Sequence, residues 1–260
     1  MKLIKDLYQY RELLKSNIKK EIRGKYKGSF LGVLWSFISP LLSVAVYAIV
    51  FPYLFRNTVD HYLQFLVVGI IPWTFFTTTV SQGIMSIRVN GGIIKKVYFP
   101  REILPISVAT SGLINFFISS LIMLLFCVLG GLGVSWHLVL FPIIAIIQYV
   151  LTLGLILGLS AINVYIKDTE HIVPFIINLL FYGTPILYDL ATFGNIPSNI
   201  MFLINLNPFK HFMDIYRDIF MYHSMPTNVD ICYVLIWAIV LFVLGLFIFK
   251  KLEKRFAEEV

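Results

Sequence analysis

Residues that could do acid–base, metal or nucleotide chemistry are sparse in this chain. The five histidines stand at positions 61, 137, 171, 211 and 223, so none has a partner four residues away, as a helical metal-binding pair requires. Cys127 and Cys232 form neither a disulfide framework nor a paired ligand spacing. No Gly-x-x-x-x-Gly-Lys-Ser/Thr run is present to bind nucleotide phosphates. We therefore expect no metal site, no cofactor held by this chain and no catalytic residue.

The one compact, charged motif is residues 90–105, Asn-Gly-Gly-Ile-Ile-Lys-Lys-Val-Tyr-Phe-Pro-Arg-Glu-Ile-Leu-Pro. Gly91 and Gly92 free the backbone before a short amphipathic run, and Pro100 and Pro105 interrupt it on either side of a charged pair. This pattern predicts one or two helical turns at a membrane surface. Two interpretations stay open: a loop whose lysines bind lipid phosphates, and a docking segment for a partner protein. The docking candidates are Lys95, Lys96, Val97, Tyr98, Phe99, Pro100, Arg101 and Glu102.

The composition excludes a water-soluble fold. Of the 260 residues, 58% are hydrophobic and 13% are charged, and the mean hydropathy is +0.84. Soluble domains need about a quarter of their residues charged. We therefore expect an all-α integral membrane protein that forms one transmembrane domain over residues 1–260.

Apolar runs predict six transmembrane helices, near residues 28–55, 62–87, 103–129, 137–166, 172–188 and 231–249. With these spans, the 21 Lys and Arg residues fall on the side of the N-terminus, except Arg56, Lys210 and Arg217. The positive-inside rule makes that side cytoplasmic and predicts that both termini lie there. The spans contain no acidic residue, which argues against coupling to protons or sodium ions.

Two further segments are too polar or too short to cross a membrane. Residues 1–24 place apolar side chains at helical spacing among lysines, which predicts an amphipathic interface helix; a simple basic anchor is the alternative. Residues 189–226 contain short apolar pieces separated by Pro197, Pro208 and Pro226. They predict outer re-entrant half-helices, and a folded amphipathic external loop is the alternative.

Aromatic side chains are abundant, at 16% of the chain. Tyr47, Phe51 and Phe55 recur every four residues on one face of the first predicted span, and Phe175 and Tyr182 lie on the fifth. Such rings either pack against lipid or offer flat surfaces for the apolar faces of sugar rings.

Taken together, several of these segments resemble one protein family: the membrane permeases of ATP-binding-cassette exporters for lipid-linked polysaccharides, including O-antigen, capsule and teichoic-acid exporters. The resemblance rests on residues 23–40, 69–73, 94–105, 164–168 and 207–209, and it covers nearly the whole chain. The third and fourth of these segments lie at predicted cytoplasmic boundaries. Within the fourth, the chain has Lys-Asp where the family usually has Arg-Asp, which keeps the charge pair.

The resemblance implies a homodimer in the bacterial cytoplasmic membrane that works with two separate ATPase subunits, which would bind ATP and magnesium. Residues 90–105 would be the coupling segment seated in the ATPase, and nucleic acid is not an expected partner. The first and fifth spans would line a channel through Tyr47, Phe51, Phe55, Phe175 and Tyr182. The remaining site residues are Lys167, Asp168 and Glu170 of the second cytoplasmic loop, and Asn207, Pro208 and Phe209 of an outer gate.

The sequence thus predicts a permease subunit that moves a lipid-anchored polysaccharide outward while a partner supplies the energy. One alternative is a type-two ABC exporter of drugs or other lipids. Another is a membrane-embedded transferase, which would need a convergent set of acid, base or metal-binding residues that the sequence lacks.

The predicted orientation can be tested by cysteine labelling in intact cells. Single cysteines at Asn57 and Asn199 should react with a membrane-impermeant thiol reagent, because both positions are expected outside. A cysteine at Gly92 should stay unlabelled until the cells are opened. Labelling of Gly92→Cys in intact cells would contradict the topology.

Overall fold

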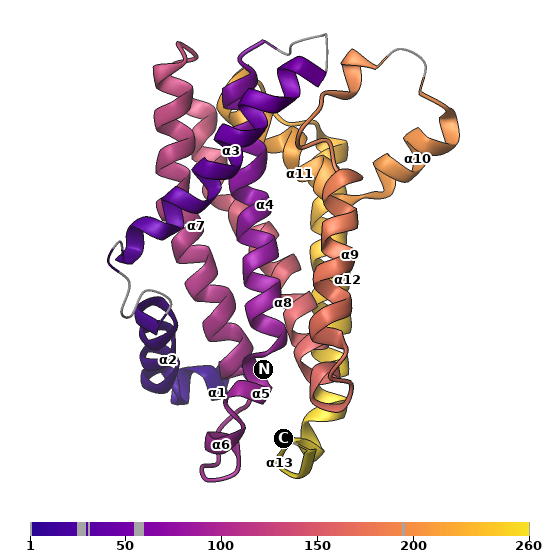
Figure 1. Ribbon diagram of the computed structural model, residues 1–260. Helices are drawn as coiled ribbons and strands as arrows, with labels where there is room; N and C mark the ends of the chain where they lie inside the picture. The colour runs from indigo at the N-terminus through magenta and orange to yellow at the C-terminus, as the bar shows by residue number, and fades with distance from the viewer. Residues whose placement is uncertain (1, 25–29, 31, 55–59, 194–195, 260) are drawn as a thin grey trace.

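The computed structural model describes residues 2–24, 30, 32–54, 60–193 and 196–259, and within these ranges every regular element is helical. Figure 1 shows the long helices running roughly side by side. The N-terminus, the C-terminus and α6 lie at one end of the molecule, whereas α10 and α11 lie at the other. An all-helical fold satisfies the backbone hydrogen bonds of a chain as apolar as this one without help from water.

Within the described residues, four helices are long and apolar enough to cross a membrane, judged by length and composition. They are α4 (Tyr62–Ile84), α7 (Ile103–Leu129), α8 (Phe141–Tyr165, preceded by the 3-10 turn Trp136–Leu140) and α12 (Asn228–Leu252). Each falls on one of the predicted spans, which confirms a membrane protein with several apolar helices.

The first and fifth predicted spans contain shorter apolar helices. Helix α3 (Trp35–Leu54) follows the 3-10 turn Gly32–Leu34, and its apolar part covers Ile38–Phe51. Helix α9 (Thr169–Tyr182) ends several residues before the predicted boundary at residue 188. Six membrane crossings therefore stay a prediction.

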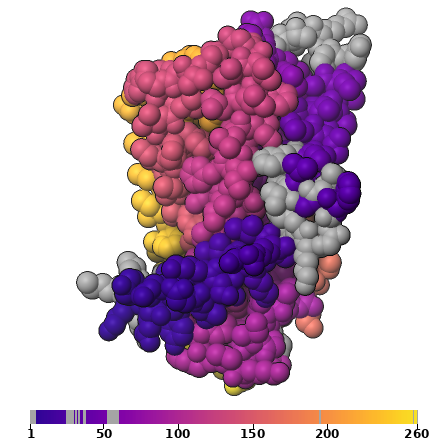
Figure 2. Space-filling model, turned by 90° about the vertical axis from the view of Figure 1, so that its left-hand side faces the viewer, coloured from indigo at the N-terminus to yellow at the C-terminus, as the bar shows by residue number. Residues whose placement is uncertain are grey.

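The predicted interface helix is divided into α1 (Lys2–Gln9) and α2 (Arg11–Gly24). Figure 2 shows both segments lying across the lower part of the molecule. Leu7, Tyr10, Leu13 and Leu14 pack against the apolar core, and α2 packs along α7. The apolar face of this segment therefore covers the protein itself.

The motif of residues 90–105 contains short helical turns, as its spacing predicts. Helix α5 (Ser86–Val89) precedes it and α6 (Gly91–Ile94) opens it, before an irregular stretch leads into α7. Pro105 lies in the first turn of α7 and does not interrupt a helix, because a first-turn residue needs no intrahelical N–H bond. The chain ends in the 3-10 turn Glu253–Arg255 and α13 (Phe256–Glu259).

Short helices occupy the region predicted to form an outer gate. After the 3-10 turn Leu190–Thr192 come α10 (Ser198–Leu206), α11 (Pro208–Arg217) and the π-helical turn Asp218–Tyr222. Each α-helix here is too short to cross a membrane alone. Their arrangement is compatible with both the re-entrant and the external-loop interpretation.

Helices α8 and α12 form the most extensive helix pair, and glycines bring their backbones together. A Cβ atom added to Gly245 would lie 1.8 Å from the carbonyl oxygen of Gly154, and one added to Gly154 would lie 2.5 Å from the backbone of Leu241. Small residues permit such close approach between helices in membranes. Gly154 and Gly158, four residues apart on α8, both face α12 at this contact.

This contact predicts that two similar substitutions affect stability to different extents. Gly245→Ala should destabilise the folded protein by roughly 1–3 kcal/mol, because its methyl group forces the two backbones apart. Gly158→Ala is the matched control, since its Cβ would meet Gly245 Cα at an ordinary 3.4 Å. Thermal unfolding in detergent measures both. Equal stability of the two variants would contradict the packing described here.

Candidate functional site

The loop of residues 95–102 presents part of the predicted docking surface to solvent. Lys95, Lys96, Val97 and Tyr98 are exposed, and the Tyr98 ring is 92% accessible. Phe99 is only 6% exposed and belongs to the apolar core. The two aromatic docking candidates therefore differ: the Tyr98 ring projects into solvent, and the Phe99 ring anchors the loop in the core.

Two charged residues fasten the end of this loop to the C-terminal helix. Arg101 donates a hydrogen bond to the backbone carbonyl of Glu253, and the buried carboxylate of Glu102 forms an ion pair with Lys250. Lys250 also contacts Glu253 at 3.1 Å. Arg101 and Glu102 are among the docking residues predicted from the sequence. Their contacts show that both also hold the loop against the end of α12.

The second loop at this end of the molecule also makes a charged contact. Arg88 of α5 lies 2.8 Å from Glu170 in the first turn of α9. Lys167 and Asp168 are exposed and make no ion pair within the described part of the chain. Of the three residues predicted in this loop, Glu170 therefore joins the two loops, and the other two face solvent.

The predicted channel aromatics lie on two helices that meet. The rings of Tyr47 and Phe51 are 5.6 Å apart, edge to face, and Tyr47 lies 6.1 Å from Phe181 of α9. Phe175 and Tyr182 are 63% and 70% exposed on the open face of α9. Phe55 lies outside the described residues. The structure thus brings α3 and α9 together and leaves an aromatic face uncovered.

At the opposite end, the predicted gate residues form a helix start. The side chain of Asn207 accepts a hydrogen bond from Phe209 N at 3.0 Å and donates one to Thr184 Oγ1 at 2.8 Å. Pro208 occupies the first position of α11, where its fixed backbone angle suits a helix. The Phe209 ring packs on Phe76, 4.1 Å between centroids. Asn207 therefore caps α11 and ties it to the end of α9.

Sequence reasoning missed the side chains that satisfy the irregular backbone after α9. Tyr62 donates to the carbonyl of Leu187 at 2.9 Å, and Arg217 donates to that of Ile186 at 3.3 Å. The Arg217 guanidinium also lies 3.4 Å from the centroid of the Phe65 ring. Burial lowers the pKa of Arg217 to about 10, partly offset by Asp214. The available signal was that Arg217 is one of three cations that the sequence places on the predicted outer side, against the charge bias of the other Lys and Arg residues.

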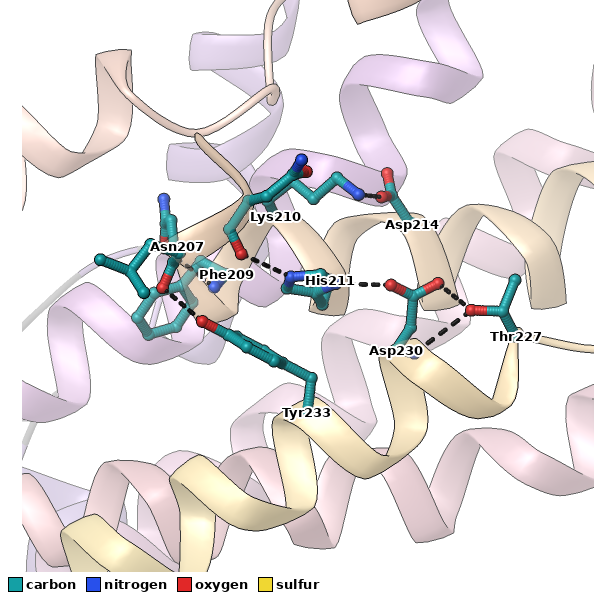
Figure 3. A network of polar contacts seen from close by, with 10 residues as sticks. Asn207, Phe209, Lys210, His211, Asp214, Thr227, Asp230 and Tyr233 are labelled. Carbon is teal, nitrogen blue, oxygen red and sulfur yellow. Dashed lines mark hydrogen bonds and ion pairs between the residues drawn. The ribbon is translucent and has the colours of Figure 1, made fainter. Parts of the chain in front are cut away.

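A buried histidine joins α10, α11 and α12 (Figure 3). His211 Nδ1 lies 2.5 Å from Asp230 Oδ1, and its Nε2 lies 2.8 Å from the carbonyl oxygen of Asn205. Thr227 donates to the other oxygen of Asp230, and the Tyr233 ring lies 4.2 Å from the imidazole. Both ring nitrogens face acceptors, so an imidazole protonated on both can donate to each. The sequence offered no spacing from which this contact could be predicted.

A pocket of about 330 Å³ lies between α3, α4 and α7. The described residues that line it bring hydroxyl and amide groups among apolar side chains, and none of them is ionisable. Thr79, which lines it, is buried, and its hydroxyl has no hydrogen-bond partner among the described residues. The polar lining residues are Ser39, Thr74, Thr78, Thr79, Gln82, Asn115 and Ser119.

Apolar helices long enough to cross a membrane, joined by charged loops at one end and capped short helices at the other, define a multi-pass helical membrane protein. Residues 12–221 match the ABC-2 type transporter family, and the chain belongs to this family. Membership makes it the membrane subunit of a transporter and not an enzyme.

Three similar proteins each match almost the whole chain. The O-antigen export system permease protein RfbA of Myxococcus xanthus is 36% identical over 260 residues, which is 100% of both chains. A protein of the same name from Klebsiella pneumoniae is 34% identical over 250 residues, covering 95% of this chain and 94% of its own. The polysialic acid transport protein KpsM of Escherichia coli is 22% identical over 245 residues, covering 90% and 91%.

The ion pair between the partly exposed Lys250 and the buried Glu102 leads to a prediction for Lys250. Lys250→Met should destabilise the protein by roughly 1–3 kcal/mol, because it leaves the Glu102 carboxylate buried without its partner. Adding Glu102→Gln should recover part of that loss. Lys251→Met, at the neighbouring exposed position, serves as the control and should have little effect. Thermal unfolding compares the four proteins, and a Lys250→Met protein as stable as wild type would exclude a structural role for the pair.

Proposed function

We infer that this chain is the permease subunit of an ABC exporter that moves a lipid-linked polysaccharide across the bacterial cytoplasmic membrane. The single observation that carries the proposal is the identity of 36% over all 260 residues with a protein named as an O-antigen export permease. The similarity to a polysialic acid transport protein supports a polysaccharide as the substrate class. The polysaccharide itself would be an O-antigen, a teichoic acid or a similar polymer.

The energy would come from a separate ATPase subunit. The chain has no phosphate-binding loop of its own, and residues 95–98 offer an exposed tyrosine beside two lysines for docking. An aromatic anchor with basic neighbours is the usual composition of a binding hot spot and its rim. Two copies of the ATPase would dock on a permease homodimer, with both termini of each permease on the cytoplasmic side.

The polymer path would lie between α3 and α9 of the two permease subunits. The uncovered aromatic face of α9, with Phe175 and Tyr182, supports this assignment because flat rings pack on the apolar faces of sugars. In the proposed six-span topology, α10 and α11 would form the outer gate. The cap at Asn207 would then set the position of α11 relative to α9.

Two competing functions fit the chain less well. A type-two ABC exporter of drugs or other lipids shares the fold, but the similar proteins named here are polysaccharide exporters. A membrane-embedded transferase would need an acid, base or metal set. Within the described residues there is no group of three or more metal-binding side chains.

The test uses the exposed ring of the docking loop. Tyr98→Ala should reduce binding of the ATPase subunit by about thirtyfold, as expected for an interface anchor worth about 2 kcal/mol. Surface polymer should fall in parallel, with lipid-linked polymer retained inside the cell. Co-purification of the two subunits and labelling of surface polysaccharide measure these effects.

The matched control is Tyr222→Ala, which removes an exposed ring at the opposite end of the molecule. It should leave ATPase binding unchanged. Phe99→Ala is unsuitable as a docking test, because truncating a buried aromatic ring costs about 3–5 kcal/mol of fold stability. Normal ATPase binding by a well-folded Tyr98→Ala protein would reject the docking assignment. Unchanged surface polymer after deletion of the whole gene would reject the export function.

A further inference from the structure

A pocket of about 390 Å³ lies between α2 and the helices it covers. Figure 2 shows α2 crossing the molecule just above the segment that contains α5 and α6. The pocket is lined from three sides, by α2, by the end of α4 with α5, and by α7. Its lining residues are Lys20, Glu21, Gly24, Gln82, Met85, Ser86, Val89, Asn90 and Val108.

One wall of this pocket provides hydrogen-bond donors. Lys20 Nζ donates to Asn90 Oδ1 at 3.0 Å, and Asn90 Nδ2 donates to the carbonyl of Ser86 at 2.8 Å. An ammonium group has three N–H donors, so two on Lys20 have no partner in the described part of the chain. Ser86 is 4% exposed, and its hydroxyl has no hydrogen-bond partner among the residues that the structure describes. These groups suit the oxygens of a phosphate.

The same pocket also carries a negative charge. Glu21 lines it and forms no ion pair with any described residue, including the adjacent Lys20. A carboxylate opposes the binding of a purely anionic group but stabilises an ammonium group. The pocket therefore contains a positive side chain, Lys20, and a negative one, Glu21, which suits a ligand that itself carries one charge of each sign.

Apolar side chains complete the pocket and indicate a lipid. Met85 and Val89 are 41% and 71% exposed beside the charged groups, and Val108 forms the α7 wall. Amphipathic helices such as α2 lie at the depth of lipid headgroups. A zwitterionic headgroup in the pocket would leave its acyl chains free to follow the apolar surface into the bilayer.

We propose that this pocket binds the headgroup of a zwitterionic phospholipid with a primary ammonium group, phosphate toward Lys20 and ammonium toward Glu21. The proposal rests on the proposed function in one respect: it requires a membrane protein in which α2 lies at the membrane surface. The bound lipid fills the space under α2 next to Asn90, where the docking segment begins. It thereby stabilises the junction between the interface helix and that segment.

The test is lipid retention by the purified, delipidated full-length protein. Phosphatidylethanolamine, phosphatidylglycerol and phosphatidylcholine are added in equal amounts, and retained lipid is counted by native mass spectrometry. Wild type should retain roughly tenfold more phosphatidylethanolamine than either of the other lipids. This ratio corresponds to the free energy of one charge-assisted hydrogen bond, here between the lipid ammonium group and Glu21. Phosphatidylglycerol has no ammonium group for Glu21, and the quaternary ammonium of phosphatidylcholine has no N–H to donate.

Two variants assign the contacts. Glu21→Gln should abolish the preference for phosphatidylethanolamine, and Lys20→Gln should weaken retention of all three lipids. Lys19→Gln and Glu12→Gln, which alter exposed residues of the same helix outside the pocket, are the controls and should behave as wild type.

Equal retention of the three lipids by wild type would overturn the proposal, as would unchanged preference in Glu21→Gln. A preference for phosphatidylglycerol would also overturn it and would identify a surface for anionic lipid. Because the measurement needs neither ATPase nor polymer, a negative result leaves the export function standing, and a failed export assay leaves the lipid site standing.

Discussion

The structure depends on one constraint: backbone polar groups that leave a helix inside the protein must find partners there. The chain meets this constraint at the end of α9, where regular hydrogen bonding stops. Side chains from three other places supply the missing donors: Tyr62 of α4 donates to Leu187, Asn207 at the start of α11 donates to Gly183, and Arg217 at its end donates to Ile186. Satisfying the backbone therefore also fastens α4, α9 and α11 to one another.

Buried polar bonds continue this connection between the long helices. Tyr216 of α11 donates to Gln148 of α8 at 2.7 Å, and Gln148 donates in turn to the carbonyl of Pro72 in α4 at 3.0 Å. A buried network with satisfied members fixes a single arrangement of its helices, because breaking any bond leaves a polar group without a partner. The short helices at the end opposite the two termini are thus held to the long helices by specific bonds as well as by apolar packing.

Charge pairs make the corresponding connections at the other end. Arg101 and Glu102 hold the docking loop to α12, and Arg88 holds α5 to α9. Because α12 and α8 are in close backbone contact through Gly154 and Gly245, the loop is connected through α12 to a tightly packed helix pair. In the proposed exporter, this pair offers a physical route from the ATPase to the outer end.

The sequence by itself determined the class of the protein and the long apolar helices, because hydropathy and charge act locally and leave a periodic pattern. Only the tertiary structure decided that Phe99 is buried, that Glu102 pairs with Lys250, and that His211 bridges to Asp230. These contacts join residues from separate helices, and no spacing along one chain encodes which faces of two helices meet.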